Sequence, residues 1–269
     1  LRLPICQGFD QYANLRPSLL LPGVTSPLRG RQAGDIDFIV VRENTEGEYT
    51  GAGGRAHRGL PIEVAVETAI FSRAGVERII RYAFELARRR RKKLASVTKS
   101  NAQRHTLTLW DEIFADLSAQ YPDVAVERVL VDAMAARFVL HPDSLDVVVA
   151  SNLFADILSD LGGAICGSLG MAPSGNLNPE RTYPSMFEPI HGSAPDIAGK
   201  GIANPIAMVW SGAMMLEFLG EAEAAALIMQ AIRETTADGQ VLPPDLGGQA
   251  TTAEVGTAIV THLRRLAAV

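Results

Sequence analysis

Apolar runs of strand length alternate with amphipathic helical stretches through the middle of the chain. Apolar runs at residues 37–41, 94–98, 124–131 and 146–150 are predicted to be strands. Helical periodicity is predicted between and after them, at residues 74–91, 106–121, 133–140 and from Asn152 onward. This repeated order of strand and helix is typical of an α/β fold with a mostly parallel sheet.

Outside these segments the hydrophobic periodicity is weaker. Short strands are predicted at residues 19–21, 63–72 and 186–188. The glycine-rich stretch 51–59 and the stretch 170–183, which is rich in Pro, Asn and Gly, are expected to be loops. Helices are predicted at residues 206–219, 222–235 and 253–266.

Polar side chains lie where predicted strands end. Arg42, Lys99, Asp132 and Asn152 each lie at the carboxyl end of an apolar run. Open α/β sheets bind ligands at the carboxyl ends of their strands. We therefore expect these side chains to share one cleft.

A helix predicted from Asn152 carries two acidic side chains, and Asn152 is expected to cap it. Asp156 and Asp160 are four residues apart, so both carboxylates project from one face. Carboxylate oxygens suit hard cations such as Mg2+ or Mn2+. The spacing alone leaves two interpretations open, a metal site or a solvated acidic face near a helix N-terminus.

Composition narrows the classes of function. The chain has 269 residues and a net charge of -5, which argues against a nucleic-acid or anionic-membrane partner. Its two cysteines, Cys6 and Cys166, fit neither a disulfide framework nor a metal spacing, so we expect a cytoplasmic protein. The basic run 88–93 could bind nucleic acid, but cations at a helix C-terminus are the favoured interpretation.

A long glycine-rich loop is predicted between residues 191 and 205. Such loops bring backbone N–H groups close to phosphates. The loop does not contain GxGxxG, so the ordinary dinucleotide-binding fingerprint is absent.

Five ordered motifs carry a resemblance to a known family. They are Val41 to Tyr49, Thr98 to Asn101, Val131-Asp132, Asn152 to Asp160, and the loop from His191 to Asn204. Together they resemble the isocitrate/isopropylmalate dehydrogenase family of decarboxylating dehydrogenases. Gln7 to Asn14, Asn44 to Gly47 and Asn176 to Arg181 are most similar to members that act on tartrate and D-malate.

The resemblance implies an isopropylmalate dehydrogenase-like α/β fold with two domains and a mostly parallel sheet. Residues 1–12 and 168–269 would form the large, cofactor-binding domain. Residues 13–167 would form a small domain with the dimer interface and the metal site. The family has further residues before the position of Leu1, so we expect the large domain to lack its N-terminal part here.

The resemblance also implies a reaction, the oxidation and decarboxylation of tartrate or D-malate. Arg16 and Arg42 would hold substrate carboxylates, because a guanidinium pairs bidentately with a carboxylate. The family has an arginine where this chain has Cys6, and Arg2 is the candidate replacement. Lys99 would act as base and Tyr49 as acid.

The remaining roles implied by the resemblance concern metal and cofactor. Asp132, Asp156 and Asp160 would bind Mg2+ or Mn2+, and K+ is a further candidate ion. Lys99 and Asp132 would come from the partner subunit of a homodimer, with Asp132 also serving catalysis. Asp196 would bind the adenosine ribose and favour NAD over NADP. Other NAD contacts would come from Asn152, Glu188, His191, Gly192, Ser193, Ala194 and Asn204.

Two alternatives remain open at this point. The substrate could be isopropylmalate or isocitrate, since part of substrate selection would lie before Leu1. The chain could also be an inactive fragment or dimerising scaffold.

Overall fold

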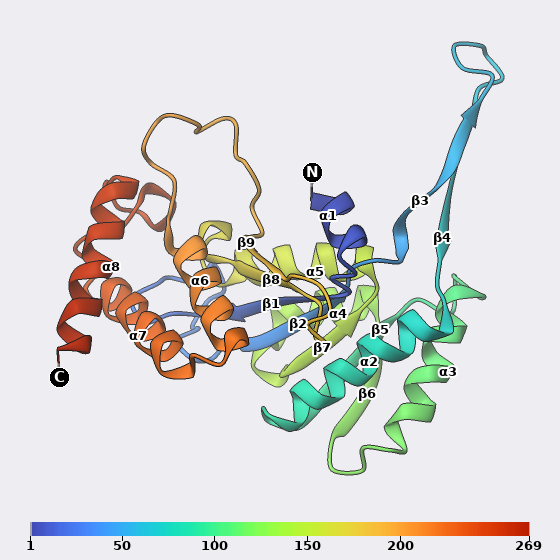
Figure 1. Ribbon diagram of the computed structural model, residues 1–269, viewed down its shortest axis with the longest axis horizontal. Coiled ribbons are helices and arrows are strands. Elements are labelled where there is room, and N and C mark those ends of the chain that lie inside the picture. The colour runs from blue at the N-terminus through green and yellow to red at the C-terminus, as the bar shows by residue number, and fades with distance from the viewer. Residues whose placement is uncertain (1, 269) are drawn as a thin grey trace.

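The computed structural model describes residues 2–268 and is organised around one mixed sheet of seven strands in the order β6-β5-β7-β2-β1-β8-β9 (Figure 1). The strands β6, β5, β7 and β2 are parallel, whereas β1, β8 and β9 add antiparallel neighbours beyond β2. The predicted α/β fold with parallel strands is therefore confirmed. Their bounds are β1 Ala13–Leu19, β2 Asp37–Glu43, β5 Lys93–Thr98, β6 Ala125–Leu130, β7 Val147–Ala150, β8 Pro173–Leu177 and β9 Met186–Pro189.

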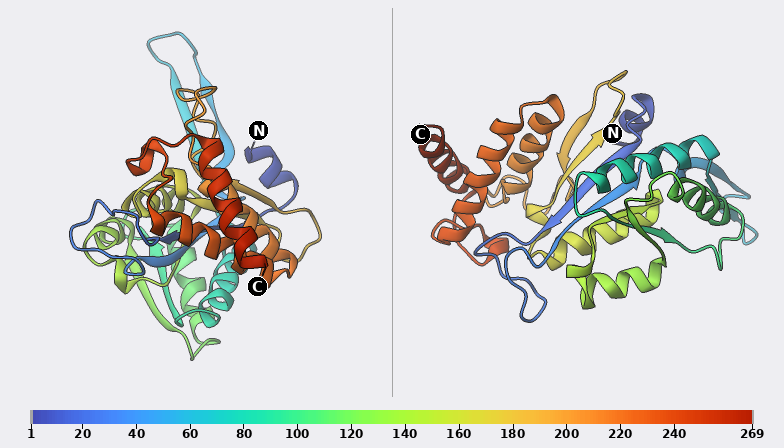
Figure 2. Two further views of the ribbon diagram at one scale, coloured as in Figure 1. Left: turned by 90° about the vertical axis from the view of Figure 1, so that its left-hand side faces the viewer. Right: turned by 90° about the horizontal axis from the view of Figure 1, so that it is seen from below.

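Helices cover both faces of the parallel part of the sheet. Helices α2 and α3 pack on one face, and α4 and α5 pack on the other (Figure 2). Helix α6 lies against β8 and β9 and is followed by α7 and α8. The bounds are α1 Arg2–Gly8, α2 Arg73–Arg88, α3 Thr106–Ser118, α4 Val131–Leu140, α5 Asn152–Ile165, α6 Ile206–Leu219, α7 Ala222–Asp238 and α8 Thr252–Ala267, with short 3-10 helices at Pro142–Ser144, Leu169–Met171 and Pro244–Leu246.

Local signals in the sequence account for several helix ends. The Ser72 hydroxyl accepts a hydrogen bond from Gly75 N at the start of α2. Thr251 and Glu254 form a capping box at the start of α8. Gly220 ends α6 in the left-handed conformation that glycine adopts without strain.

The buried apolar side chains form two clusters. The larger cluster lies between the parallel strands and α2 to α5, and it includes Phe38, Phe84 and Trp110. The smaller cluster lies among α6, α7 and α8, and it includes Ile206 and Ile232. Burial of these side chains is the main force that holds the helices on the sheet.

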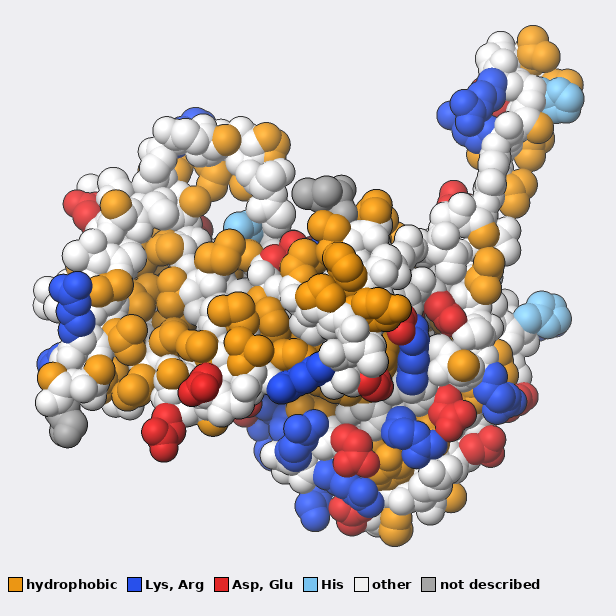
Figure 3. All heavy atoms as spheres, viewed as in Figure 1, with side chains coloured by type: hydrophobic (Ala, Val, Ile, Leu, Met, Phe, Trp, Pro, Cys, Tyr) orange, Lys and Arg blue, Asp and Glu red, His pale blue; other side chains and the backbone are white. Residues whose placement is uncertain are grey.

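A two-stranded hairpin projects from the body of the molecule (Figures 1 and 3). It consists of β3 Gly47–Ala56 and β4 Val64–Ile70. The prediction of a loop at residues 51–59 is therefore wrong for residues 51–56, which lie in β3, where Gly53 and Gly54 pair with β4. The strand predicted at residues 63–72 is confirmed as β4. Apolar side chains are exposed along the hairpin and its tip, at Leu60, Ile62, Val64, Val66 and Ile70.

Two further predictions are wrong near the antiparallel edge. The strand expected at residues 19–21 is instead β1, which ends at Leu19. Strand β8 lies in a stretch that was expected to be a loop. Its five residues are all buried although Ser174 and Asn176 are polar, so an apolar pattern could not predict it.

The basic run after α2 forms ion pairs. Arg90 Nε lies 2.8 Å from Asp146 Oδ1, and Arg90 Nη2 lies 2.8 Å from Asp37 Oδ1. Arg91 also pairs with Asp37. Only Arg88 lies in the last turn of α2, so these arginines mainly tie that helix end to the starts of β2 and β7.

In the part of the chain that the structure describes, no helix is long and apolar enough to cross a membrane.

Candidate active site

Arg16 on β1 and Arg42 on β2 converge on Asp156 of α5. Arg16 Nη1 lies 3.1 Å from Asp156 Oδ1, and Arg42 Nη1 pairs with the same oxygen. The two strands are neighbours, and α5 packs across them, which brings the three side chains together. The arginine side chains are only 5% and 1% exposed, whereas that of Asp156 is 34% exposed. The carboxylate thus lies at the opening of a buried cationic site.

Tyr49 of β3 completes this group. Its hydroxyl donates a hydrogen bond to Asp156 Oδ2 at 3.1 Å, and Arg42 Cζ lies 5.4 Å from the ring centroid. Burial and the neighbouring Asp156 carboxylate raise the pKa of Tyr49, so its hydroxyl keeps its proton at neutral pH.

The turn between β2 and β3 is built to bring Tyr49 to this position. The buried Glu43 carboxylate accepts hydrogen bonds from Thr45 N at 2.9 Å and from Glu46 N at 2.8 Å. Gly47 has a φ of 75°, which a residue with a Cβ rarely adopts. The side chain of Glu43 and the freedom of Gly47 therefore fold the chain back toward α5.

Helix α5 begins differently from the prediction. Asn152 is its first residue, and the N-cap residue Ser151 makes no capping bond with its side chain. Glu48 of β3 instead accepts from Leu153 N at 3.3 Å. A carboxylate at a helix N-terminus is favoured by the helix dipole.

The cationic surroundings decide the charge of Asp156. Burial would raise its pKa, but the charges of Arg42 and Arg16 outweigh burial, so the pKa is lowered. Burial, with Arg42 as neighbour, lowers the pKa of Arg16 to about 9. Arg16 therefore stays protonated and Asp156 stays ionised at neutral pH.

Asp160 lies one turn beyond Asp156 and is open to solvent. Arg16 Nη1 is 3.6 Å from Asp160 Oδ1, and the Asp160 side chain is 54% exposed. Both carboxylates thus lie on one face of α5, as predicted. They offer hard oxygen ligands that fit Mg2+ or Mn2+. Among the described residues no three His, Cys, Asp or Glu side chains form a metal-binding group.

Lys99 and Asp132 form a separate pair at the ends of β5 and β6. Lys99 Nζ lies 2.6 Å from Asp132 Oδ1, and the side chains are 28% and 65% exposed. The hydrogen bond with Lys99 lowers the pKa of Asp132. Within residues 2–268, no hydrogen bond or ion pair joins either side chain to the group around Asp156. Arg42, Lys99, Asp132 and Asn152 were predicted to share one cleft. Within one chain they instead form two separate pairs, Lys99 with Asp132 and Arg42 with Asn152.

Arg2 and Cys6 lie one turn apart on α1 and contact the same atom. Arg2 Nη2 donates to Asn176 Oδ1 at 3.1 Å, and Cys6 Sγ donates to it at 3.7 Å. Arg2 Nε also pairs with Glu188 at 2.8 Å. A helix places side chains four residues apart on one face, so Arg2 can reach the region beside Cys6.

The predicted cofactor loop follows β9 and extends outward between β9 and α6 (Figure 1). His191, Gly192, Ser193 and Asp196 are exposed, and Ala194 is partly exposed with a φ of 39°. Asn204 is buried at the other end of the loop. It accepts from Ile206 N at 2.9 Å and donates to Asp245 at 3.0 Å, so it fixes the start of α6.

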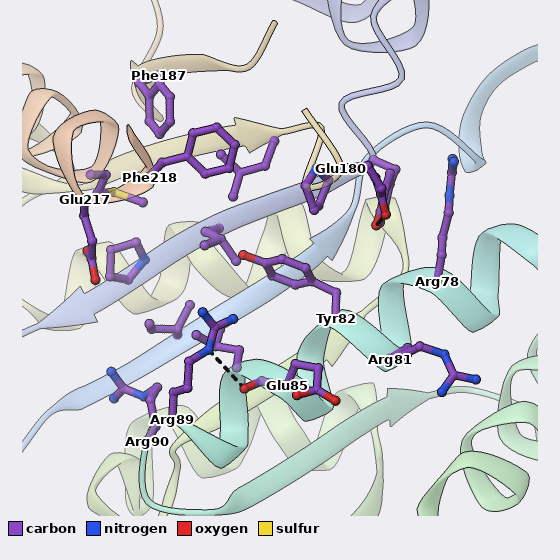
Figure 4. Close-up of a pocket in the computed structure, with 18 of the residues that line it drawn as sticks. Arg78, Arg81, Tyr82, Glu85, Arg89, Arg90, Glu180, Phe187, Glu217 and Phe218 are labelled. Carbon is purple, nitrogen blue, oxygen red and sulfur yellow. Dashed lines mark hydrogen bonds between the residues drawn. The ribbon is translucent and has the colours of Figure 1, made fainter. Parts of the chain in front are cut away.

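A large cavity of the described structure lies away from the group around Asp156. It has a volume of about 1210 Å³ and lies between α2 and α6 over the open face of β1 and β2 (Figure 4). Tyr82, Phe187 and Phe218 line it, and arginines including Arg78 and Arg89 surround it. None of the predicted site residues lines this cavity. The convergent charged groups at Asp156 therefore mark the candidate active site better than cavity size does.

Comparison with known proteins agrees with the motifs. A model of the isocitrate/isopropylmalate dehydrogenase family matches residues 2–260. The chain belongs to this family. Its relatives in the family include a probable tartrate dehydrogenase/decarboxylase of Agrobacterium vitis, 62% identical over 260 residues that cover 96% of this chain and 72% of the relative.

Two further members of the family support the comparison. The D-malate dehydrogenase [decarboxylating] of Escherichia coli K12 is 56% identical over 263 residues, which cover 96% of this chain and 73% of the relative. The crystal structure of isocitrate dehydrogenase from Methylococcus capsulatus superposes with a TM-score of 0.90 at 40% identity, covering 98% of this chain and 76% of that one. The family and the fold inferred from the sequence are thus confirmed.

Proposed function

We propose that this protein oxidises and decarboxylates a 2-hydroxy dicarboxylic acid, tartrate or D-malate, with NAD and a divalent cation. The observation that carries the proposal is the convergence of Arg16, Arg42 and Tyr49 on Asp156. Two buried guanidinium groups beside ionised carboxylates suit a substrate with two carboxylates and a metal-bound hydroxyl. The tartrate and D-malate enzymes among the relatives support the choice of substrate.

Substrate carboxylates would bind to Arg16 and Arg42, with Arg2 as a third candidate. Arg2 is held near Asn44 by a 3.2 Å bond from its Nη2 to the amide oxygen. We propose that it replaces, from one turn upstream, the arginine that the family pattern places at Cys6.

Asp156 and Asp160 of one subunit and Asp132 of its partner would hold Mg2+ or Mn2+. The bound cation would lower the pKa of the substrate hydroxyl and polarise the ketone. Lys99, also from the partner, would accept the hydroxyl proton as general base. After CO2 leaves, Tyr49 would donate its hydroxyl proton to the carbon, and its raised pKa keeps that proton available.

NAD would lie along the loop after β9 and accept the hydride. Glu188, His191, Gly192, Ser193, Ala194, Asp196 and Asn204 are the proposed contacts, with Asn152 at the start of α5. The exposed backbone of the loop around Gly192 and Ala194 is open to a ligand. The Asp196 carboxylate would repel a 2'-phosphate and favour NAD over NADP.

The active site would be shared between two subunits. Exposed apolar side chains on the hairpin, such as Ile62 and Val66, and on α4 and α5, such as Leu140 and Ile157, suit a homodimer interface. We also propose the division into residues 13–167 and residues 1–12 with 168–269, which broadly follows the two apolar clusters.

Initial rates with NAD and Mn2+ would test the proposal. We expect turnover of D-malate and tartrate to exceed that of isopropylmalate and isocitrate, with release of CO2. Omission of the cation or addition of a chelator should abolish turnover. The chemistry is wrong if none of the four acids is oxidised, and the choice of substrate is wrong if isopropylmalate or isocitrate is preferred.

A further inference from the structure

The guanidinium of Arg16 has three nitrogen atoms, and two of them are hydrogen-bonded to the described residues. Its Nε donates to Asn14 Oδ1 at 2.7 Å, and its Nη1 donates to Ser159 Oγ at 2.7 Å and to Asp156. Its Nη2 has no hydrogen-bond partner among the described residues, yet it is not among their buried unpaired atoms. Nη2 therefore reaches solvent and is the atom available to a ligand.

The amide of Asn14 can face Arg16 in only one way. Its Nδ2 donates to Gly175 O at 3.2 Å and to Asn176 Oδ1 at 2.9 Å, and the residue is fully buried. These acceptors fix the orientation of the amide, so the oxygen must face Arg16 Nε. Asn176 is itself held by a 3.0 Å bond to Glu188.

The same arrangement occurs at the second arginine. Arg42 Nε donates to Asn152 Oδ1 at 2.8 Å, and Asn152 Nδ2 donates to Glu46 O at 3.2 Å. Arg42 Nη1 also pairs with Asp156. In both cases a fixed asparagine oxygen binds Nε, which determines where the Nη edge of the planar fork points.

We infer that Asn14 is a positioning residue that aims Arg16 Nη2 at a substrate carboxylate. This inference rests on the proposed role of Arg16 in substrate binding. A guanidinium that is already oriented loses less conformational freedom when the substrate binds. Asn14 itself touches no substrate, so it acts only through Arg16.

Replacement of Asn14 by alanine should weaken binding of the acid selectively. We expect the KM for D-malate to rise about tenfold, because a hydrogen bond to a charged group is lost, with the KM for NAD unchanged. Asn178→Ala is the matched control. Asn178 is equally buried and its amide makes four hydrogen bonds, none of them to an arginine. The Asn178→Ala substitution should lower thermal stability without changing the KM for D-malate.

A double-mutant cycle separates positioning from general destabilisation. Arg16→Lys keeps the positive charge but has no Nε–H for Asn14 to hold. Calorimetric binding of malonate, a dicarboxylate without a hydroxyl, should weaken about tenfold on Asn14→Ala in the wild-type background. It should not weaken further on Asn14→Ala in the Arg16→Lys background. Asn14→Ser is the milder variant for the same cycle if the alanine variant does not fold.

The outcomes separate this inference from the proposed function. Additive effects of the two substitutions would overturn the positioning role even if D-malate is oxidised. Non-additive effects on malonate binding without oxidation of any acid would support the positioning role and contradict the proposed reaction. Failure of the wild-type protein to bind either acid would overturn both.

Discussion

The two halves of the proposed catalytic set differ in how they are held. The arginines of the group around Asp156 are buried, and several elements support the group, since Arg16, Arg42 and Tyr49 come from three strands and meet on one helix. Lys99 and Asp132 lie at the ends of neighbouring strands and bind each other, and their side chains are 28% and 65% exposed. The first half is organised within one chain, whereas the second half is displayed at the surface.

This difference suggests a division of tasks. A buried set of arginines can bind a substrate without rearrangement, because its side chains are already fixed. Lys99 and Asp132 are held by each other, and another surface that packs against them would restrict them further. The comparison therefore predicts that variants in the two halves differ in their effects on binding, turnover and stability.

The largest effect is expected from Lys99→Ala. Loss of the general base should reduce turnover of D-malate by a factor of about 100 or more. Binding of NAD and the midpoint of unfolding should not change, because exposed ion pairs contribute little. Lys93→Ala, at the other end of the same strand, is the matched control and should retain full activity. Near wild-type turnover of Lys99→Ala would rule out the assignment of the base.

A smaller effect on turnover is expected from Tyr49→Phe. Removal of the hydroxyl should slow protonation after decarboxylation about tenfold to a hundredfold, and oxidation less. Separate measurement of the ketone and of CO2 distinguishes the two steps. Tyr183→Phe, a change at an exposed tyrosine, serves as the control. Equal slowing of both steps would argue against Tyr49 as the acid.

Stability should depend on the half around Asp156 more than on the half formed by Lys99 and Asp132. Asp156→Asn leaves the buried Arg42 without a paired carboxylate and Arg16 with only the exposed Asp160, which should cost about 3 kcal/mol of unfolding free energy at neutral pH. The exposed Asp132→Asn should leave the midpoint of urea unfolding unchanged. Similar losses for the two variants would contradict the contrast between the buried and the exposed half.

The charge of Asp156 also predicts how the stability of the protein depends on pH. Although burial opposes ionisation of Asp156, the arginines lower its pKa below the ordinary value of about 3.9. The contribution of ionised Asp156 to the stability of the fold is therefore complete above about pH 4 and is lost as the pH falls through the lowered pKa. The stability difference between the wild type and Asp156→Asn should shrink as the pH falls below about 4 in urea unfolding. A difference that stays constant to the lowest pH would contradict the lowered pKa.

The sequence allowed much of the parallel sheet to be predicted, because its strands are continuous apolar runs between periodic helices. It also indicated Asp156 and Asp160 on one helix face. Strand β8 could not be predicted in this way, because Asn176 is buried by hydrogen bonds to polar partners rather than by apolar packing. Strand β3 of the hairpin was missed because its glycines resemble a loop, although Gly53 and Gly54 pair with β4.

The supporting residues of the site were also missed. Asn14 and Ser159 hold Arg16, and Glu48 supports the start of α5. Each is a common polar residue whose role depends on a partner distant in the sequence. The Asn-Leu-Arg order of residues 14 to 16 was the available signal, because alternate residues of a strand point to one face.

Mixing two inactive variants tests the shared active site most directly. Lys99→Ala and Asp156→Asn subunits, exchanged at equal concentration, should form mixed dimers in which one site is intact. About a quarter of the wild-type turnover of D-malate should then return. Mixing Asp156→Asn with Arg42→Lys, both from the buried half, should restore none. No recovery in dimers that native mass spectrometry shows to be mixed would contradict the account.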